Sequence, residues 1–158
     1  MKKTTASHGV WLLAVVSNLA AALTPVATVV YAQFLDELKL RSAPNAIECG
    51  VAESKAAQDA ALKCADQALA RSQPFWFARR MQGIDSALWM GAASDGRGHS
   101  YRLYFDSDVH GGGDAHPKPS LDAFKCTDTD MRDVNWPPFP GKECKGIDLI
   151  APLAQAPY

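Results

Sequence analysis

Several motifs that mark common enzymes and nucleic-acid-binding proteins are missing from this sequence. No serine lies in a GxSxG turn. The one glycine run, at 111–113, is followed by two prolines, so it does not open a phosphate-binding helix. The cysteines include no CxxC pair, the pattern of redox motifs and zinc knuckles. Sixteen basic and 17 acidic residues give a net charge of −1, which predicts no nucleic-acid partner.

Charge is also missing from the long stretch between Val10 and Leu35. This stretch follows two lysines and contains an apolar core, a helix-breaking proline and the small-residue ending 30-VYA-32. The order is typical of a secretory signal peptide, with cleavage predicted after Ala32. An uncleaved membrane anchor is the alternative, because the run exceeds the ~20 residues that span a bilayer. Both interpretations place the rest outside the cytoplasm, either periplasmic or secreted, or tethered to the inner membrane by this segment.

Four cysteines lie beyond that segment: Cys49, Cys64, Cys126 and Cys144. An even number in an exported chain predicts two disulfides with three possible connectivities. One helix through the first two would hold them ~22 Å apart, whereas a disulfide needs Cα atoms within about 7 Å. Pairing them would require the helix to begin after Gly50 and the chain to double back. We therefore expect Cys64–Cys126 and Cys49–Cys144.

The periodicity of the central region predicts one main helix followed by a meander. Residues 52–71 form an alanine-rich amphipathic pattern, with Ser54 as the predicted N-cap. Residues 75–84, 87–95 and 99–105 alternate in polarity and are separated by turn sequences. Residues 120–126 can add a fourth strand. The expected fold class is α+β, with one helix packed on a three- to four-stranded antiparallel meander and two disulfides.

The predicted domain organisation has four parts. A signal peptide or anchor (1–32) precedes an N-terminal lead (33–50) and an α+β core domain (51–126). The last part, 127–158, is a proline-rich, irregular segment tied down by a disulfide, in which 147–150 pairs briefly with a sheet edge. The sequence contains no internal repeat.

A loop rich in aspartate, glycine and histidine, 106-DSDVHGGGDAH-116, is the candidate metal site. Its candidate ligands are Asp106, Asp108, His110, Asp114 and His116. The spacing partly imitates a calcium loop, but the closing glutamate is replaced by Pro117. Zinc would use the two histidines with the aspartates. The alternative is a solvated turn, because aspartate and glycine are typical turn residues. We predict no cofactor, with calcium or zinc as the exception that this loop permits.

Aromatic and arginine side chains on the predicted sheet form the candidate partner-binding surface. They are Trp76, Arg80, Trp89, Arg102 and Tyr104, which we expect on the face opposite the helix. Tryptophan, tyrosine and arginine dominate interface energetics. The alternative is that they belong to the core, or that the C-terminal segment covers them, because a sheet with apolar groups on both faces must be covered.

These patterns favour a small exported, disulfide-stapled binding domain of the bacterial cell envelope, of the accessory, inhibitor or immunity type. Its partner would be an envelope protein or peptide. The runner-up is an exported metal-binding protein that uses the aspartate–histidine loop. A third hypothesis is an exported hydrolase whose active site the sequence does not locate; enzymatic activity is the less favoured alternative.

Overall fold

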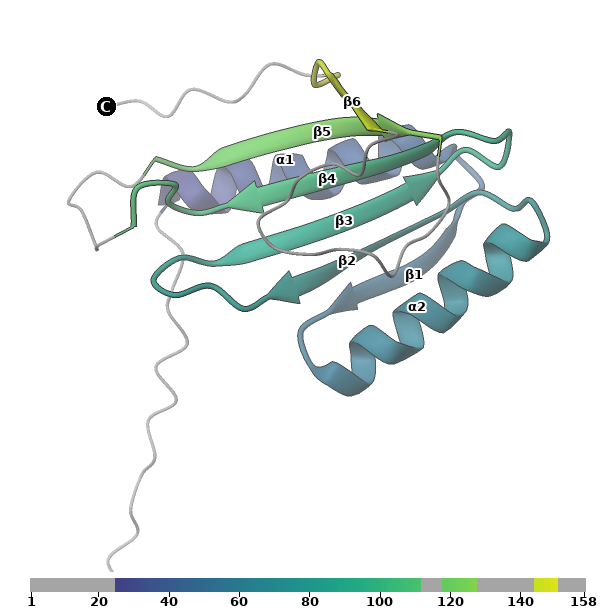
Figure 1. Cartoon of the computed structure of the whole chain (residues 1–158), viewed down its shortest axis with the longest axis horizontal. Coiled ribbons are helices and arrows are strands. Elements are labelled where there is room, and N and C mark those ends of the chain that lie inside the picture. Colours follow the sequence, from purple (N-terminus) through teal and green to yellow (C-terminus); the bar gives the residue numbers. More distant parts are fainter. Residues whose placement is uncertain (1–24, 112–117, 128–143, 151–158) are drawn as a thin grey trace, which may run out of the picture.

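A computed structural model describes residues 25–111, 118–127 and 144–150. Within these residues, two helices and six strands follow one another in the order α1 (Pro25–Ser42), β1 (Ile47–Ala52), α2 (Lys55–Ala70), β2 (Phe75–Met81), β3 (Leu88–Ser94), β4 (Ser100–Asp106), β5 (Ser120–Cys126) and β6 (Cys144–Ile147). The strands form one sheet in which spatial order equals sequence order. The two helices lie on opposite faces of this sheet (Figure 1).

Strand pairing explains why the sheet is mixed. The β1 strand pairs with β2 in parallel, and α2 supplies the crossover that a parallel connection needs. From β2 to β6 every neighbouring pair is antiparallel and joined in sequence, so this part is a meander. The α+β class with two disulfides is confirmed. The predicted single helix and three to four strands understate the fold, which has a second helix and an added strand at each edge.

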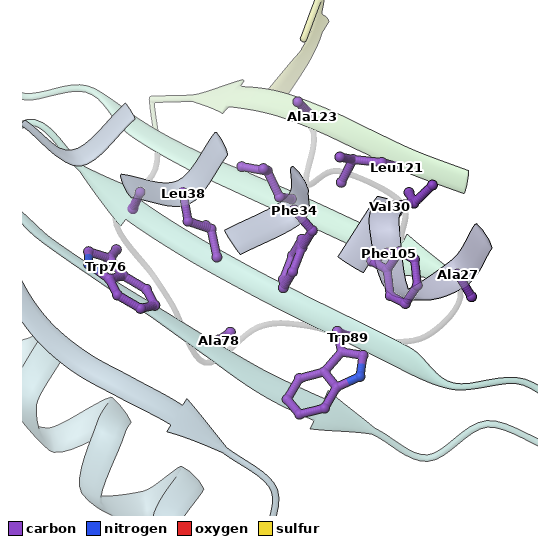
Figure 2. Close-up of a cluster of buried hydrophobic side chains, with 12 residues drawn as sticks. Ala27, Val30, Phe34, Leu38, Trp76, Ala78, Trp89, Phe105, Leu121 and Ala123 are labelled. Carbon is purple, nitrogen blue, oxygen red and sulfur yellow. The ribbon is translucent and has the colours of Figure 1, made fainter. Parts of the chain in front are cut away.

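Helix α1 packs across the middle of the sheet and builds the larger core (Figure 2). Its buried residues recur at helical spacing and meet the residues of β2 to β5 that point to this face. The α1 members are Ala27, Val30, Phe34 and Leu38. Gly91 of β3 allows a close approach, since a Cβ there would lie 2.5 Å from Leu38 Cδ1. The absence of a side chain at this position therefore brings α1 close to the centre of the sheet.

Helix α2 covers the other face over β1 and β2. Its N-cap is Ser54, whose hydroxyl accepts a hydrogen bond from the backbone N–H of Ala57, as the sequence predicts. Ala61, Ala65 and Ala68 are its buried residues, and they pack near Phe75 and Phe77 of β2. Small side chains on this stripe let the helix lie close to the large rings beneath it.

The disulfides join Cys49 to Cys64 and Cys126 to Cys144, so the predicted pairing is wrong. The helix begins after Gly50, and the chain doubles back from β1 into α2, which brings the first two Cα atoms within 5.6 Å. The second bridge joins opposite positions on β5 and β6, 4.0 Å apart. The error arises because β1 was not predicted, so the strand that carries the first cysteine was not expected beneath the helix.

Two of the predicted domain boundaries fall within or next to elements of the structure. The predicted cleavage point at Ala32 falls inside α1, and the predicted lead at 33–50 contains the second half of α1 and most of β1. Near the C-terminus, the predicted strand at 147–150 overlaps β6 only at Ile147. Most of the predicted irregular segment, including 128–143, lies outside the described residues.

Candidate functional site

The five predicted partner-binding residues do not share one face of the sheet. Trp76 and Trp89 point toward α1, where they are 4% and 7% exposed (Figure 2). Lys39 of α1 lies over the Trp76 ring, with 5.5 Å from Nζ to the centroid. Trp89 packs against Tyr31, at 5.1 Å between ring centroids. Both tryptophans are core residues, because α1 occupies the face that was expected to stay open.

Arg102 and Tyr104 lie on the opposite face, where they are 2% and 6% exposed. Tyr104 meets Phe124 edge to face at 5.8 Å, and Nη1 of Arg102 lies 3.8 Å from Sγ of Cys144. The expectation that all five residues present one common surface is therefore wrong. Trp89 of β3 is paired with Phe105 of β4 and shares its face. Because side chains alternate along β4, Tyr104 points to the other face. Of the five, only Arg80 is exposed to solvent.

Two loops that are distant in sequence meet at one end of the sheet. The backbone N–H of Ala87 donates to Oγ of Ser107 at 2.7 Å, and the N–H of Ser107 donates to the carbonyl of Ala87 at 3.0 Å. The Asp85 carboxylate lies against the backbone of Gly111. These contacts join residues 82–87, between β2 and β3, to residues 107–111, which follow β4. We call these two segments together the hairpin end.

An open cleft of about 530 Å³ lies beside the hairpin end. Its lining consists of Glu53, Gln58, the last two residues of β2 (Arg80 and Met81) and the turn residues 82–86. The side-chain amide of Gln58 on α2 donates to the carbonyl of Arg80 at 2.9 Å, which ties the helix to this strand end. Ile84 at the tip of the turn is fully exposed, and Val109 in the adjoining loop is 48% exposed. The lining of the cleft thus combines charges of both signs with the exposed apolar side chain of Ile84.

The carboxylates of two aspartates in the predicted metal loop accept hydrogen bonds from backbone N–H groups of the same loop. Oδ1 of Asp106 accepts from the N–H of Asp108 at 2.9 Å. Oδ1 of Asp108 accepts from the N–H groups of His110 and Lys118, both at 3.3 Å. These are the local bonds by which aspartate stabilises turns. Asp108 is 9% exposed, so its carboxylate is built into the loop.

The structure brings three of the five predicted metal ligands into this loop, namely Asp106, Asp108 and His110. Among the described residues, no group of three or more histidine, cysteine, aspartate or glutamate side chains is arranged to hold a metal ion. Asp114 and His116 lie outside the described residues. The geometry of the described part therefore favours a structural turn.

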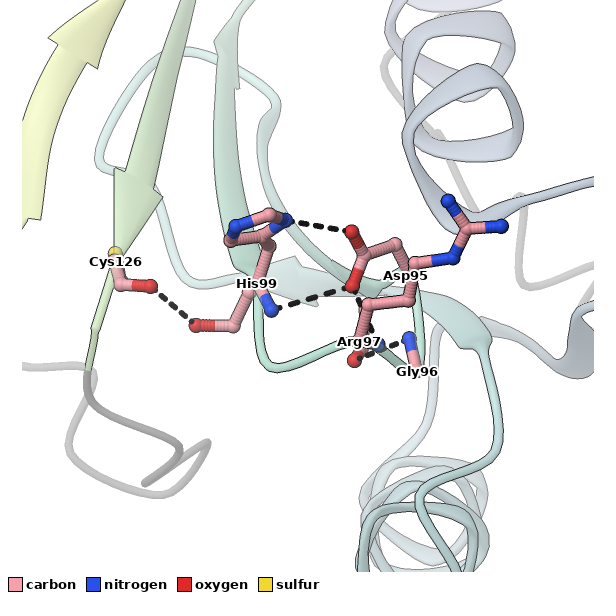
Figure 3. A network of polar contacts seen from close by, with 7 residues as sticks. Asp95, Gly96, Arg97, His99 and Cys126 are labelled. Atoms are coloured by element: carbon pink, nitrogen blue, oxygen red, sulfur yellow. Dashed lines mark hydrogen bonds and ion pairs between the residues drawn. The ribbon is translucent and has the colours of Figure 1, made fainter.

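A second polar cluster lies at the opposite end of the sheet, in the β3–β4 turn (Figure 3). Oδ2 of Asp95 lies 2.7 Å from Nδ1 of His99, and Oδ1 accepts from the N–H groups of Arg97 and His99. Burial raises the pKa of Asp95, but these hydrogen bonds together outweigh it and hold the pKa below its usual value.

Serines near this pair are committed to the backbone. Oγ of Ser94 accepts from the N–H of Gly96 at 3.3 Å, and Oγ of Ser100 donates to the carbonyl of Cys126 at 3.1 Å. A nucleophilic serine would instead donate to the histidine ring. The contacts of Asp95 and His99 are those of a pair that stabilises a turn, so they give the hydrolase hypothesis no support.

Sequence reasoning missed Ile84 and the cleft beside it. A signal was present, since Ile84 is an aliphatic residue between Gly83 and Asp85 in a predicted turn, where polar residues are usual. The contact between residues 82–87 and 107–111 depends on strand register, which local patterns do not give.

Comparisons with known proteins add no likeness to this geometry: no family model matches the chain, and no curated protein or solved structure matches it.

Proposed function

We propose that the chain is a small exported binding domain of the bacterial cell envelope, acting as an accessory, inhibitor or immunity-type protein. One disulfide lies at each edge of the sheet, and such bonds support a location in an oxidising compartment. The lysine-initiated apolar leader supports export. Binding is favoured over catalysis because the polar clusters at both ends of the sheet stabilise turns.

The contact surface that we propose is the hairpin end with its cleft. The observation that carries this proposal is Ile84, a large apolar side chain fully exposed on a tied-down turn beside Arg80. A single exposed aliphatic residue is ordinary. Here, however, Val109 is exposed on the loop that hydrogen bonds join to the same turn, next to an open cleft. Such a combination can bury apolar area on a partner without rearranging the fold.

The chemistry of the cleft indicates the kind of partner. Arg80 offers a planar donor group to a carboxylate, while Glu53 offers acceptors to a basic group. An apolar side chain at the centre of the partner's contact surface would cover the exposed Ile84. We therefore propose a protein or peptide segment that presents an apolar side chain flanked by charged groups of both signs.

Site-specific photo-crosslinking in the envelope of a bacterium that carries the native partner tests this proposal. A photoreactive amino acid replaces Gln82, which is exposed and lines the cleft. We expect a discrete adduct after irradiation. The adduct should disappear when Ile84→Asp and Arg80→Glu are added, because these changes remove the apolar contact and reverse the charge.

The matched control is Arg97→Glu, at an exposed position in the turn at the other end of the sheet. This variant should retain the adduct. Thermal melts of all variants, with disulfides intact, verify that the fold is retained. An adduct that survives the double variant, or none from a folded and oxidised protein, contradicts the proposal for this surface.

A further inference from the structure

Helix α1 contains residues that a leader ending at Ala32 would remove. Ala27 and Val30 are each 1% exposed and belong to the same buried cluster as Phe34 and Leu38 (Figure 2). Cleavage after Ala32 would cut α1 near its middle and strip these two residues from the core. The sheet residues Phe105 and Leu121, which share this cluster, would then lose part of their cover.

Tyr31 is also embedded in the folded domain. Its ring lies 5.1 Å from Trp89, 5.6 Å from Phe105 and 5.9 Å from Phe34, measured between centroids. Burial, together with the negative charge of Glu53, raises the pKa of its hydroxyl. Tyr31 is partly buried, and its three aromatic partners on β3, β4 and α1 attach it to the core cluster. The folded domain therefore needs its chain from at least Ala27 onward.

Because the domain uses these residues, the apolar run outside it is shorter than the sequence alone indicates. From Val10 to Thr24 this run has 15 residues, which as a helix would be ~22 Å long, short of the ~30 Å of a bilayer core. It also contains the polar pair Ser17 and Asn18. In the described part of the chain, no helix is long and apolar enough to cross a membrane. A run of this length is typical of the apolar region of a cleaved signal peptide.

The last residues of this run, just before α1, include small side chains at the spacing that a signal peptidase reads. Ala20 and Ala22 form an A-x-A pattern three residues before Pro25, where α1 begins. We propose that the chain is processed between Ala22 and Leu23, and that residues 25–32 stay in the mature protein as the first half of α1. This inference rests on the export part of the proposed function and is independent of the partner surface.

The step is a hydrolysis that needs water and an envelope signal peptidase. Water adds to the carbonyl carbon of Ala22, and the bond from this carbon to the nitrogen of Leu23 breaks. The products are a carboxylate on Ala22 and a free amine on Leu23. No electron is transferred, and no further reactant is consumed.

Expression of the full chain in a Gram-negative host tests the inference. The host is fractionated, and the first residue of the exported protein is read by mass spectrometry. We expect Leu23. Ala22→Phe places a bulky ring at the position preceding the scissile bond, so the processed form should be lost and the precursor should accumulate. The matched control is Ala32→Phe, at an exposed position of α1, which should be processed like the unchanged chain.

The outcomes separate this inference from the proposed function. Any first residue other than Leu23, or loss of processing in Ala32→Phe, overturns the assigned site. An intact chain retained in the membrane also overturns it, in favour of an anchor. A chain found in the cytosol with free thiols overturns both this inference and export. Processing at Leu23 without a partner adduct at residue 82 supports this site and contradicts only the binding surface.

Discussion

Two neighbouring valines in α1 provide a sharp test of the N-terminal half of the fold. Val30 is 1% exposed in the core, whereas Val29 is 49% exposed on the same helix. Valine-to-alanine substitution changes the intrinsic helix propensity equally at both positions. A difference between the two variants in the free energy of unfolding therefore reports burial of residue 30 alone.

The magnitude follows from the groups that are removed. Losing two buried methyl groups costs about 1.6 kcal/mol at ~0.8 kcal/mol per buried carbon, and the cavity adds to this cost. The higher helix propensity of alanine returns up to ~0.6 kcal/mol. Val30→Ala should therefore destabilise the protein by about 1–2 kcal/mol. Val29→Ala should be neutral or stabilise it by up to ~0.6 kcal/mol.

Urea titration of the purified protein, with both disulfides intact, measures both values. The two variants and the parent should share one slope, so that midpoint shifts convert directly to free energy. Equal effects at residues 29 and 30 would refute the reasoning, because they would mean that the first half of α1 does not pack on the sheet. The processing site inferred before α1 would then lose its structural basis.

Two further predictions concern positions with little room for change. Gly91→Ala should destabilise the protein by about 1–3 kcal/mol, because its Cβ would overlap Leu38. Gly146→Ala should have a small effect, because a Cβ there would lie 4.0 Å from the Phe124 ring, an ordinary van der Waals distance. Equal losses in the two variants would argue against close packing of α1. Asp95→Ala should cost about 1–2 kcal/mol at neutral pH by removing the acceptor for two backbone N–H groups. Folding lowers the pKa of Asp95. Its contribution to the free energy of unfolding should therefore be complete above the unfolded pKa of about 3.9 and lost as pH falls through the lower folded value. A loss of this contribution as pH rises toward 7 would contradict the assignment.

The local elements of the fold were predictable where the pattern was long and periodic. The helix predicted at 52–71 is α2, Lys55–Ala70, with Ser54 as its cap. The alternation at 75–84, 87–95 and 99–105 corresponds to β2, β3 and β4, and residues 120–126 form β5. In each case one period dominates the segment, and glycine or proline marks its ends.

Helix α1 and strand β1 were not predicted, because other features of the sequence obscure their patterns. Helix α1 begins within an uncharged run, so its residues up to Ala32 were assigned to the leader, although Ala27, Val30 and Phe34 have the spacing of a buried helix face. The β1 strand is short, carries Gly50 at a φ of +96°, and pairs in parallel with a strand 28 residues further along. Parallel pairing across a crossover leaves no local turn signature.

The candidate site illustrates the same limit. The residue types in the sequence favour the tryptophans and the aspartate–histidine loop as site residues. Burial assigns Trp76 and Trp89 to the core, and hydrogen bonding assigns Asp106 and Asp108 to the loop backbone. Chemistry-bearing residues are thus used for folding, while the exposed feature is an isoleucine in a turn. Ile84 becomes a candidate contact residue only because the strand register brings its turn next to the loop at 107–111, and local sequence patterns do not give this register.

At the hairpin end, the carboxylate of Asp108 is buried whereas the apolar side chain of Ile84 is exposed. This difference indicates how a partner would bind. Asp108 is buried and already accepts two backbone hydrogen bonds, so a ligand that recruited it would first have to break them. Ile84 is already in water on a turn that is tied to the neighbouring loop, so burying it costs no native contact of this kind. Association at this end should therefore be driven by apolar burial around Ile84. The charges of Arg80 and Glu53 would then set orientation and specificity.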